Sequence, residues 1–440
     1  GALAGRDNAY DALFERYGVC RCTSIDEMMD TLELFASGMR PRTAGLTALH
    51  DSGGQRALLV DLAEEQGLEF AVISEETTGK LAAVLEPGLD PINPLDAWGT
   101  GNEADVIYTE CLRALDADPA TGLNLFACDL YPSDDEDFFY PQIAEGLLGE
   151  LQNPLAWLVH LSASTSRPQV EALRKLGVPV LMGTETGLKA VAHLMNHRAF
   201  QRRLADGDTG AKRSVPAPGN LDDLAAELGA AKSPLGEHQS KKLLAAYGLA
   251  IPRERLVASE AEAKRAAAEI GYPVALKTAA GELHKTERGG VRLGLASEEE
   301  LAGAYLDFEA RLGGSVLVQE MVGEGVEILL GIVNDDQFGP MLSLASGGVF
   351  VELWDDFRML ALPADAERIR EAVLALRVAP MFGGFRGRPA ADLEAAVQAA
   401  LGLSALAEDL GSLIGEVDIN PLRVLSRGAL VVDALVVPRA

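Results

Sequence analysis

The sequence predicts an α/β protein that begins with a doubly wound parallel sheet and continues into a second, mixed α+β part. From residue 42 to about residue 200, short apolar segments alternate with amphipathic helical segments. This alternation is typical of a parallel sheet that helices cover on both faces. Near the C-terminus, two strand-like stretches flank a turn at residues 426–428, as in an antiparallel hairpin.

The individual elements follow from the period of the apolar residues. Helical spacing at residues 9–14 and 25–32 predicts that the N-terminal segment is helical. Helices are also expected at residues 55–66 and 170–176. Residues 203–234 are rich in Ala, Gly, Asp and Pro, which indicates a linker. The strand candidates of the parallel sheet are residues 45–50, 69–73, 123–129, 156–161 and 178–182.

Composition and charge indicate a protein with buried cores and argue against nucleic-acid and membrane partners. The 440 residues are 48% hydrophobic, which is enough to bury two or three cores. The net charge of −28 argues against nucleic acid as a partner, because binding its backbone needs clustered Lys and Arg. No apolar stretch reaches the roughly 18 residues that a membrane helix needs, so we expect no membrane partner and a cytoplasmic location.

The spacing of cysteine and histidine does not predict a metal centre. Cys20 and Cys22 are too close for a paired zinc motif without a second pair nearby, and reduced thiols are expected. His193 and His197 are four residues apart on a predicted helix, but no Glu completes the catalytic HExxH pattern. His160 lies in an apolar strand and is expected to be a core residue.

The first strand of the parallel sheet ends at a glycine-rich turn. Ser52, Gly53 and Gly54 follow this strand and open a helix. Backbone N–H groups at a helix N-terminus, together with the Ser52 hydroxyl, form an anion site, and ligands bind at the carboxyl ends of parallel strands. The turn is therefore a candidate phosphate-binding site. The alternative is a serine N-cap followed by flexible glycine.

A second candidate phosphate site lies on the loop between the strand-like segments 273–277 and 291–295. His284 and Lys285 precede the pair Gly289–Gly290, which lets backbone N–H groups approach an oxygen closely. A neutral imidazole can also attack phosphorus and carry the phosphoryl group. The alternative is a solvated loop in which His284 has no role.

The C-terminal hairpin supplies a candidate metal site. It would place Asn420 in one strand beside Asp433 in the next. One amide oxygen and one carboxylate suit Mg²⁺ when nucleotide phosphates fill the other positions. The alternative is an ordinary hairpin with polar residues on its exposed face.

Together these segments resemble the ATP-grasp domain of ADP-forming acyl-CoA synthetases, the NDP-forming acetate–CoA ligases of the succinyl-CoA synthetase superfamily. Residues 237–244 are similar to the opening helix of that domain. Segments 316–322, 336–340 and 346–352 are similar to its hinge, central strands and glycine turn, in the family's order. The first part of the chain then corresponds to a flavodoxin-like sheet, and the second to a two-lobed α+β ATP-grasp domain.

The resemblance implies roles for nucleotide-binding residues. Lys277 is similar to the lysine that holds the ATP phosphates. Gln319, Glu320 and Val322 lie in the stretch that meets adenine, and Glu327 takes the place of a ribose-binding carboxylate.

The resemblance also implies a path for the phosphoryl group. His284 would be a second phosphoryl relay, and Asp418 would orient its imidazole. Asn420 and Asp433 would bind Mg²⁺ and so neutralise the phosphates. The turn at residues 52–54 would hold the phosphate of a phosphohistidine.

The start of the chain resembles the interior of a longer family member. Residues 1–5 are similar to the end of a motif in which the family's first phosphoryl acceptor, a histidine, precedes the glycine. We therefore expect residues 1–41 to be the C-terminal remnant of an upstream CoA-ligase domain, with an N-terminal CoA-binding domain lying before this sequence. Residues 42–200 would form the flavodoxin-like ligase domain of succinyl-CoA-synthetase type, 201–234 the linker and 235–440 the ATP-grasp domain.

The implied enzyme interconverts a carboxylic acid, CoA and ATP with acyl-CoA, ADP and phosphate through acyl phosphate and phosphohistidine. Its cofactors and substrates would be ATP or ADP, Mg²⁺ and coenzyme A. The expected partners are further copies of the chain or a CoA-binding domain or subunit. Two alternatives stay open: another ATP-grasp carboxylate ligase, and a nucleotide-binding regulatory or partner subunit without turnover. The flavodoxin-like part argues against a simple amine ligase, which has no need of a phosphate-docking sheet.

Overall fold

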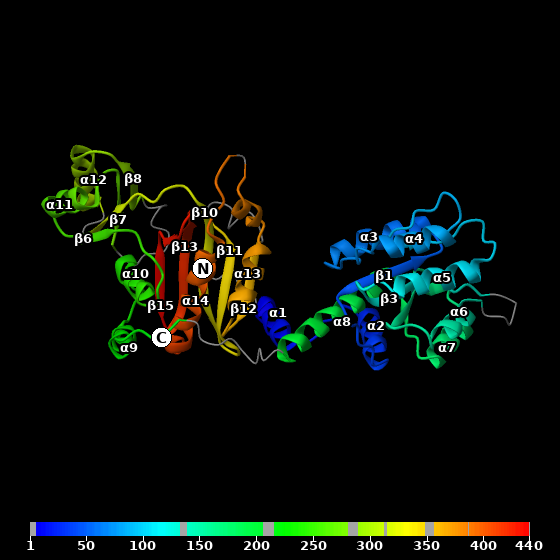
Figure 1. Ribbon diagram of the computed structural model, residues 1–440. Coiled ribbons are helices and arrows are strands. Elements are labelled where there is room, and N and C mark those ends of the chain that lie inside the picture. The colour runs from blue at the N-terminus through cyan, green and yellow to red at the C-terminus, as the bar shows by residue number, and fades with distance from the viewer. Residues whose placement is uncertain are drawn as a thin grey trace. The chain divides into compact units, whose positions relative to one another are not determined.

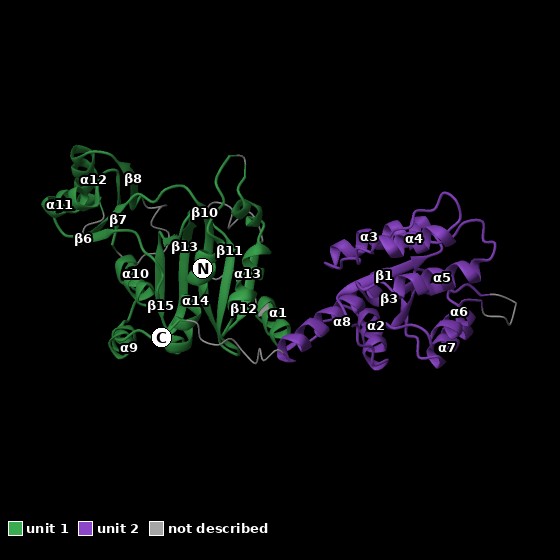
Figure 2. Ribbon diagram, viewed as in Figure 1, with its two compact units in different colours: residues 1–16, 208–440 green, residues 17–207 purple. Residues whose placement is uncertain are grey.

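The computed structural model contains two compact units, which are shown in different colours in Figure 2. The parallel-sheet unit is residues 17–207, and the C-terminal unit combines residues 1–16 with residues 208–440. Each unit has its own sheet or sheets and its own hydrophobic cores. The structure describes residues 6–132, 139–205, 215–279, 289–311, 315–347, 356–385 and 387–439.

The parallel-sheet unit is built on five parallel strands in the order β2-β1-β3-β4-β5. Figure 1 labels β1 and β3 of this sheet, with helices around them. The strand order is flavodoxin-like. It confirms the doubly wound sheet that the alternation of strands and helices predicts. The strands are β1 (Gly45–His50), β2 (Leu95–Asp96), β3 (Thr121–Ala127), β4 (Leu155–Val159) and β5 (Val180–Met182).

Strands β1, β3, β4 and β5 each contribute to two cores, because successive side chains point to opposite faces. Leu46 and Ala48 of β1 lie in one core, and Leu49 lies in the other. Helices α2 (Ile25–Ala36), α3 (Gly53–Glu65) and α8 (Thr184–Ala205) complete the first core, and α4 (Glu75–Val84), α5 (Ala104–Asp116), α6 (Phe139–Leu147) and α7 (Arg167–Lys175) complete the second.

The predicted strand at residues 69–73 is wrong, and β2 takes the edge position instead. The segment forms an isolated bridge with Leu46. The Asn93 side chain accepts a hydrogen bond from Ala48 N (3.0 Å). Its Nδ2 donates to Leu46 O and Ala71 O at 2.9 Å each. A side-chain amide therefore satisfies backbone groups of β1 that a continuous edge strand would use.

The C-terminal unit has two lobes, each built on an antiparallel sheet. The larger sheet has the order β12-β11-β10-β13-β14, and β15 also pairs with β13. Helices α13 (Ala366–Leu374) and α14 (Leu393–Leu410) pack against it in one extended core. Its strands are β10 (Val326–Asp335), β11 (Gly339–Ser346), β12 (Phe357–Ala361), β13 (Ile414–Val424), β14 (Ala429–Val431) and β15 (Ala434–Pro438).

The smaller lobe completes the two-lobed architecture predicted for this part of the chain. Its sheet has the order β6-β9-β7-β8. Leu276 and Val318 of this sheet pack with Phe308 from a covering helix. Its elements are β6 (Glu254–Val257), β7 (Val274–Thr278), β8 (Val291–Leu295), β9 (Val316–Glu320), α11 (Glu260–Ile270) and α12 (Glu298–Arg311), and α10 (Glu237–Ala246) precedes them in the chain.

Helix α1 (Arg6–Tyr17) belongs mainly to the C-terminal unit, although it starts the chain. Ala9 and Ala12 pack against Met341 of β11. Residues 1–41, predicted as one remnant, are therefore divided: α1 packs on the larger sheet, whereas α2 packs on the parallel sheet.

The segment predicted as a linker, residues 203–234, contains a helix, α9 (Leu221–Ala230). Leu224 and Leu228 lie four residues apart on one side of this helix, and both are buried in the core of the larger lobe. The Ala and Leu of the segment are good helix formers, so its Gly and Asp content alone does not indicate an extended linker.

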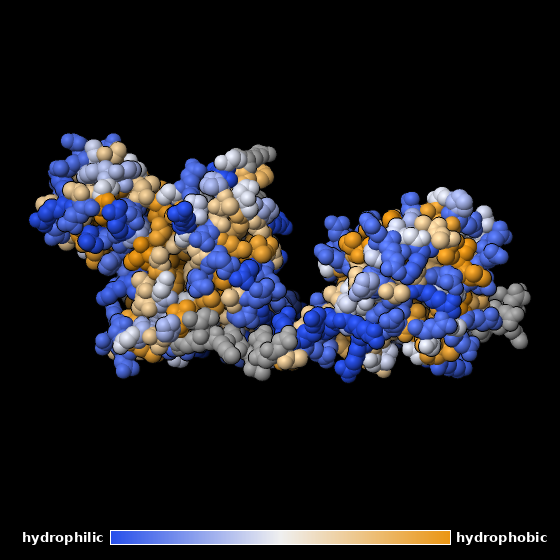
Figure 3. Space-filling view, viewed as in Figure 1, coloured by the Kyte–Doolittle hydropathy of each residue, from blue (hydrophilic) through white to orange (hydrophobic). Residues whose placement is uncertain are grey.

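Hydrophilic residues cover much of the visible surface of both units (Figure 3). In the whole chain, 66 Asp and Glu residues outnumber 38 Lys and Arg residues. Among the helices in the described ranges, none combines the length and the apolar composition that a membrane crossing requires.

Leu228→Ala should lower the free energy of unfolding of the C-terminal unit by about 2–4 kcal/mol, because it leaves a cavity in a core. The Leu228 side chain is only 2% exposed. Glu227→Ala, on the exposed side of α9, is the matched control and should change stability by less than about 0.5 kcal/mol. Urea-dependent hydrogen exchange of the α14 amides measures both. Equal stability of the two variants would show that α9 is not part of this core.

Candidate functional site

One face of β13 carries acidic and amide side chains. Val417 and Ile419 are buried in the core of the larger lobe. Because strand residues alternate between faces, Glu416, Asp418 and Asn420 share the opposite face. We call these three residues the acidic face of β13.

Asp433, in the connection between β14 and β15, lies next to Asn420 of the acidic face. Asn420 N donates to Asp433 O (3.2 Å), which confirms the predicted pairing of these residues across the hairpin. Burial raises the pKa of Asp418 to about 6, and the negative charges of Glu416 and Asp433 add to this shift. The carboxylates therefore lie close together and, with the Asn420 amide, form an oxygen donor set of the kind that Mg²⁺ prefers.

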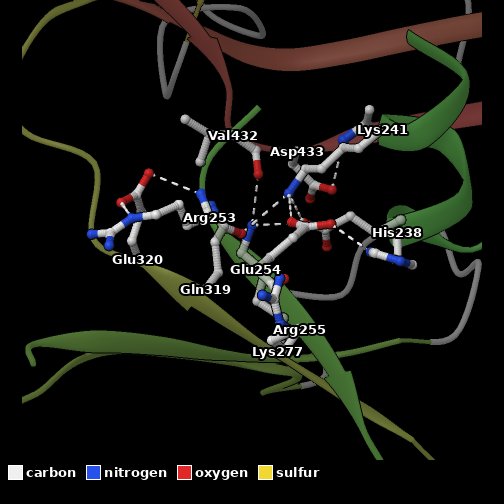
Figure 4. A network of polar contacts seen from close by, with 12 residues as sticks. His238, Lys241, Arg253, Glu254, Arg255, Lys277, Gln319, Glu320, Val432 and Asp433 are labelled. Carbon is white, nitrogen blue, oxygen red and sulfur yellow. Dashed lines mark hydrogen bonds and ion pairs between the residues drawn. The ribbon is translucent and has the colours of Figure 1, made fainter. Parts of the chain in front are cut away.

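The ammonium of Lys277, on β7, contacts the larger lobe next to Asp433 (Figure 4). Lys277 Nζ donates to Val432 O and to Glu237 Oε1, at 2.8 Å each. The Lys277 side chain is 5% exposed. Burial lowers the pKa of Lys277, whereas Glu237 and Asp433 oppose that shift. A buried lysine thus links the two lobes beside the acidic face of β13.

A second buried lysine, Lys241, belongs to an ionic network that the sequence motifs do not indicate (Figure 4). Its Nζ donates to Glu237 Oε1 (2.5 Å), Glu254 Oε2 (3.0 Å) and Gln319 Oε1 (3.2 Å). His238 Nδ1 lies 2.8 Å from the other oxygen of Glu254. The i, i+4 spacing of Glu237 and Lys241 on α10 is a visible signal, but no local pattern links them to Glu254 on β6.

Gln319 and Glu320 lie at the end of β9, and their side chains have protein partners. The Gln319 side chain is buried and accepts the hydrogen bond from Lys241. The Glu320 carboxylate accepts hydrogen bonds from Arg253 N (2.9 Å) and Arg253 Nε (2.7 Å). Their predicted contact with a nucleotide would therefore use backbone groups of this stretch.

Arg423, which the motifs do not indicate, contacts two of the residues predicted to bind nucleotide. Its guanidinium donates to the Glu327 carboxylate and to Val322 O, the latter at 3.2 Å. Glu327 on β10 lies directly opposite Arg423 on β13. Such cross-strand positions favour an ion pair. One guanidinium therefore ties the predicted hinge to the predicted ribose-binding carboxylate.

His284 lies outside the described residues, so its relay role stays a prediction. The ends of its loop are described, since Thr278 N donates to Gly290 O (2.9 Å) where β7 and β8 meet. Lys277 directly precedes this junction. Asp418 lies near the other carboxylates of β13, and its contact with the imidazole stays a prediction as well.

The turn at residues 52–54 joins β1 to α3, as predicted. Ser52 is the N-cap of α3, and its hydroxyl accepts a long hydrogen bond from Gln55 N (3.5 Å). A Cβ at Gly53 would lie 2.9 Å from Asp96 Oδ2, so a larger residue would force the Asp96 side chain to move. The turn combines the N-cap of the alternative interpretation with the helix N-terminus that anion binding uses.

Asp129 ties this turn to the neighbouring strand ends. Its Oδ2 accepts a hydrogen bond from Gln55 Nε2 (2.7 Å). Its Oδ1 accepts from His160 N (2.7 Å) and Leu161 N (2.9 Å). The sheet extends in opposite directions from β1 and β3, and ligands bind at such switch points in open α/β sheets. Asp129 therefore links Gln55, in the first turn of α3, to the backbone after β4, at the edge of the sheet where ligands are expected.

Two histidines at the ends of β1 and β4 are stacked, with ring centroids 5.7 Å apart. His160 Nδ1 lies 2.8 Å from Thr184 Oγ1, as expected for a core residue with a polar partner. Within the described ranges, neither ring nitrogen of the fully buried His50 has a hydrogen-bond partner. Burial lowers the pKa of His50 to about 3, so its ring is neutral at pH 7.

Comparison with known proteins relates the chain to a group of ligases. Residues 227–437 match the family described as the ATP-grasp domain. The chain is 35% identical over 222 residues to subunit beta of ADP-forming acetate–CoA ligase II of Pyrococcus furiosus, covering 48% of this chain and 94% of that subunit. It is 28% identical over 447 residues to ADP-forming acetate–CoA ligase I of Archaeoglobus fulgidus, covering 98% of this chain and 62% of that protein.

A further relative and a solved structure are also similar to parts of the chain. The chain is 29% identical over 452 residues to trans-feruloyl-CoA synthase FCS1 of an unknown prokaryotic organism, covering 99% of this chain and 61% of that protein. A solved structure of the dinucleotide-forming acetyl-coenzyme A synthetase 1 of Ca. Korarchaeum cryptofilum matches 50% of this chain and 100% of its own, with a TM-score of 0.47 and 32% identity. The chain spans 61–62% of the length of three of the curated relatives that it matches along nearly its whole length.

His50→Leu should make the parallel-sheet unit less sensitive to acid. The unfolded chain takes up a proton near pH 6.5, whereas the folded pKa of about 3 keeps the buried ring neutral. Stability therefore falls as the pH is lowered from 6.5 toward 3. The variant removes this loss, which is about 2 kcal/mol at pH 5. Urea unfolding at pH 7 and pH 5, followed by the fluorescence of the buried Trp157, measures the difference.

Leu49→Ala is the matched control, because it removes a buried side chain from the same strand without a titratable group. It should lower stability by similar amounts at both pH values. If His50→Leu keeps the acid sensitivity of the wild type, His50 is not the group that causes it.

Proposed function

The chain belongs to the family of ADP-forming acetate–CoA ligases, and we propose that it supplies the nucleotide-binding and phosphoryl-transferring part of an acyl-CoA synthetase. The complete reaction would interconvert a carboxylic acid, CoA and ATP with acyl-CoA, ADP and phosphate. The names of relatives include acetate, 4-hydroxybutyrate and trans-feruloyl-CoA. The acid would therefore be a small aliphatic or aromatic carboxylic acid.

The proposal is carried by the buried ammonium of Lys277 beside the acidic face of β13. Lys277 donates to Val432 O, one residue before Asp433. Phosphate oxygens would be attracted to this ammonium directly and to the carboxylates through a divalent cation. A triphosphate between the two lobes would then meet both of the positive groups that phosphoryl transfer needs.

Asn420 and Asp433 would hold Mg²⁺, with Glu416 and Asp418 as further carboxylates close by. These amide and carboxylate oxygens fit the ligand preference of Mg²⁺. The ion, when bound, would neutralise charge on the transferring phosphate. Two protein ligands are few for an ion that dehydrates reluctantly, so tight binding would require the nucleotide.

The remaining groups of the site would position the nucleotide. Lys277 would hold its phosphates, and the backbone at the end of β9 and at Val322 would flank the adenine. Glu327 would accept hydrogen bonds from the ribose, for which its carboxylate would have to exchange or share the Arg423 guanidinium. Arg423 would thereby keep the carboxylate in place before the nucleotide enters.

In the direction of ATP formation, the phosphoryl group would travel in three steps. Phosphate attacks acyl-CoA, the thioester breaks, and CoA leaves as acyl phosphate forms. A histidine takes the phosphoryl group and releases the carboxylate, and the group then passes from histidine to ADP. His284 would be the relay on this chain, and the turn at residues 52–54 would hold the phosphate carried on a histidine.

CoA binding and the first phosphohistidine would come from a CoA-binding domain or subunit that assembles with this chain. Separately named alpha and beta subunits among the relatives from Pyrococcus furiosus support such an assembly. We place the enzyme in the cytoplasm, because its proposed substrates ATP and CoA are used there. Homo-oligomers of the complete unit are the expected assembly.

An assay of ADP formation with the full-length gene product tests the function. ATP would be supplied with CoA and, in turn, acetate, 4-hydroxybutyrate and ferulate. ADP release that requires both CoA and an acid supports the proposal. ADP release that requires an amine instead of CoA would identify another carboxylate ligase. Nucleotide binding without turnover would identify a regulatory or partner subunit.

Lys277→Ala should weaken the binding of a non-hydrolysable ATP analogue by about 10- to 100-fold, because a hydrogen bond to a charged group contributes roughly 1.5–3 kcal/mol. Lys242→Ala, on the exposed side of α10, is the matched control and should retain the affinity. Isothermal titration calorimetry measures both variants. Unchanged affinity in Lys277→Ala would remove this residue from the nucleotide site.

His284→Asn should abolish an acid-labile, base-stable label that γ-labelled ATP and Mg²⁺ leave on the wild-type residue. The variant keeps the polarity and approximate size of the side chain but removes the nucleophile. Nucleotide affinity should stay nearly intact, because binding would depend mainly on Lys277, Glu327 and the metal. Phosphopeptide mapping locates the label, and His197→Asn is the control. Substantial turnover in His284→Asn, with no label in the parent, would exclude the relay role.

A further inference from the structure

A cysteine, a glutamate and a histidine come together in the parallel-sheet unit, outside the residues assigned to nucleotide or phosphate. Cys22 lies between α1 and α2, Glu27 in the first turn of α2, and His193 on α8. One ligand atom from each, the thiol sulfur, a carboxylate oxygen and an imidazole nitrogen, lies within 4.8 Å of the other two. Glu27 Oε1 and His193 Nε2 are 2.9 Å apart.

The surrounding chain holds the Glu27 carboxylate in one orientation. Glu27 Oε2 accepts hydrogen bonds from Thr23 N (3.0 Å) and Thr23 Oγ1 (2.7 Å), so that Oε1 faces His193. Ser24 caps α2 by accepting a hydrogen bond from Glu27 N (3.1 Å). Hydrogen-bonded outer partners of this kind orient ligands around a metal.

A hydrogen bond between Glu27 and His193 accounts for the positions of these two side chains, but not for the position of the Cys22 thiol beside them. The thiol of Cys22 makes a long contact with Thr31 Oγ1 (3.9 Å), which is weak even for sulfur. The Glu27 side chain is 3% exposed and the His193 side chain 18%. The three groups thus form a partly shielded cluster with donor atoms of three different kinds.

A lysine near the cluster already has a carboxylate partner. Lys189, one turn before His193, is paired with Glu185 at 2.8 Å. Its charge also interacts with Glu27, but the pairing with Glu185 already balances it.

We propose that Cys22, Glu27 and His193 bind a divalent transition metal, with Zn²⁺ as the preferred ion. Thiolate, imidazole and carboxylate are the ligand types that Zn²⁺ takes in proteins, whereas Mg²⁺ and Ca²⁺ favour oxygen ligands. The fourth tetrahedral position is filled by water. The ion links the segment before α2 to α8 and so stabilises the parallel-sheet unit.

Cobalt substitution tests this site directly. Full-length protein freed of metal with a chelator is titrated with Co²⁺ and followed by absorption spectroscopy. A tetrahedral site with a cysteine ligand should give a thiolate-to-cobalt charge-transfer band and intense d–d bands, which Zn²⁺ then abolishes by displacement. Zn²⁺ should also raise the midpoint of thermal unfolding, because it binds the folded state.

Variants at the ligands and at a neighbour separate this site from chance binding. Cys22→Ser should lose the charge-transfer band, and His193→Asn should weaken Co²⁺ binding by about tenfold or more. His197→Asn, one turn further along α8, should keep the wild-type spectrum and affinity. Circular dichroism checks that each variant is folded. The absence of the band from the wild type, or its persistence in Cys22→Ser, would overturn the proposal.

Discussion

The arrangement of the C-terminal unit depends on the buried ion pairs that the Lys241 ammonium forms. This ammonium stands between Glu237 and Glu254, and all three side chains are almost completely buried. Loss of this lysine would remove the cation that the two buried carboxylates share and leave them only Lys277 and His238 as partners. Breaking a buried ion pair costs up to roughly 3–5 kcal/mol. Because Glu237 also accepts a hydrogen bond from Lys277, the network joins α10, β6 and β7. The ammonium of Lys277 is thus positioned by Glu237, which lies in the predicted opening helix, through contacts that the motif does not indicate.

The larger lobe carries a group of carboxylates that lies beside this network of buried ion pairs. There, burial raises the pKa of Asp418, and the negative charges of Glu416 and Asp433 add to the shift. A cluster of negative charge beside a buried ammonium suits a ligand that carries both phosphates and a divalent cation. The proposed function therefore depends on opposite charges that two separate lobes bring to one place, and Arg423 adds a guanidinium that pairs with Glu327 on the same sheet.

In the parallel-sheet unit, single polar side chains form hydrogen bonds with the backbone at the edge and the ends of the strands. The Asn93 amide takes hydrogen bonds of β1 that an edge strand would otherwise use. Asp129 connects Gln55, just after the glycine turn, with the backbone at the end of β4. Both side chains are anchored by groups far away in the sequence. The proposed metal cluster also joins residues that are far apart in the sequence. Cys22 and Glu27 come close to His193 only because α2 packs against α8.

The local period of apolar residues was enough to predict the strands whose side chains alternate between two faces. Strand β1 has its predicted limits, and the hairpin that pairs Asn420 with Asp433 forms as expected, because both depend on neighbouring residues and a short turn. Tertiary packing alone decided the edge strand, the burial of Leu228 on α9 and the partners of Lys241. Each of these depends on groups that are distant in the sequence, and a local pattern of apolar and polar residues does not specify which distant groups will meet.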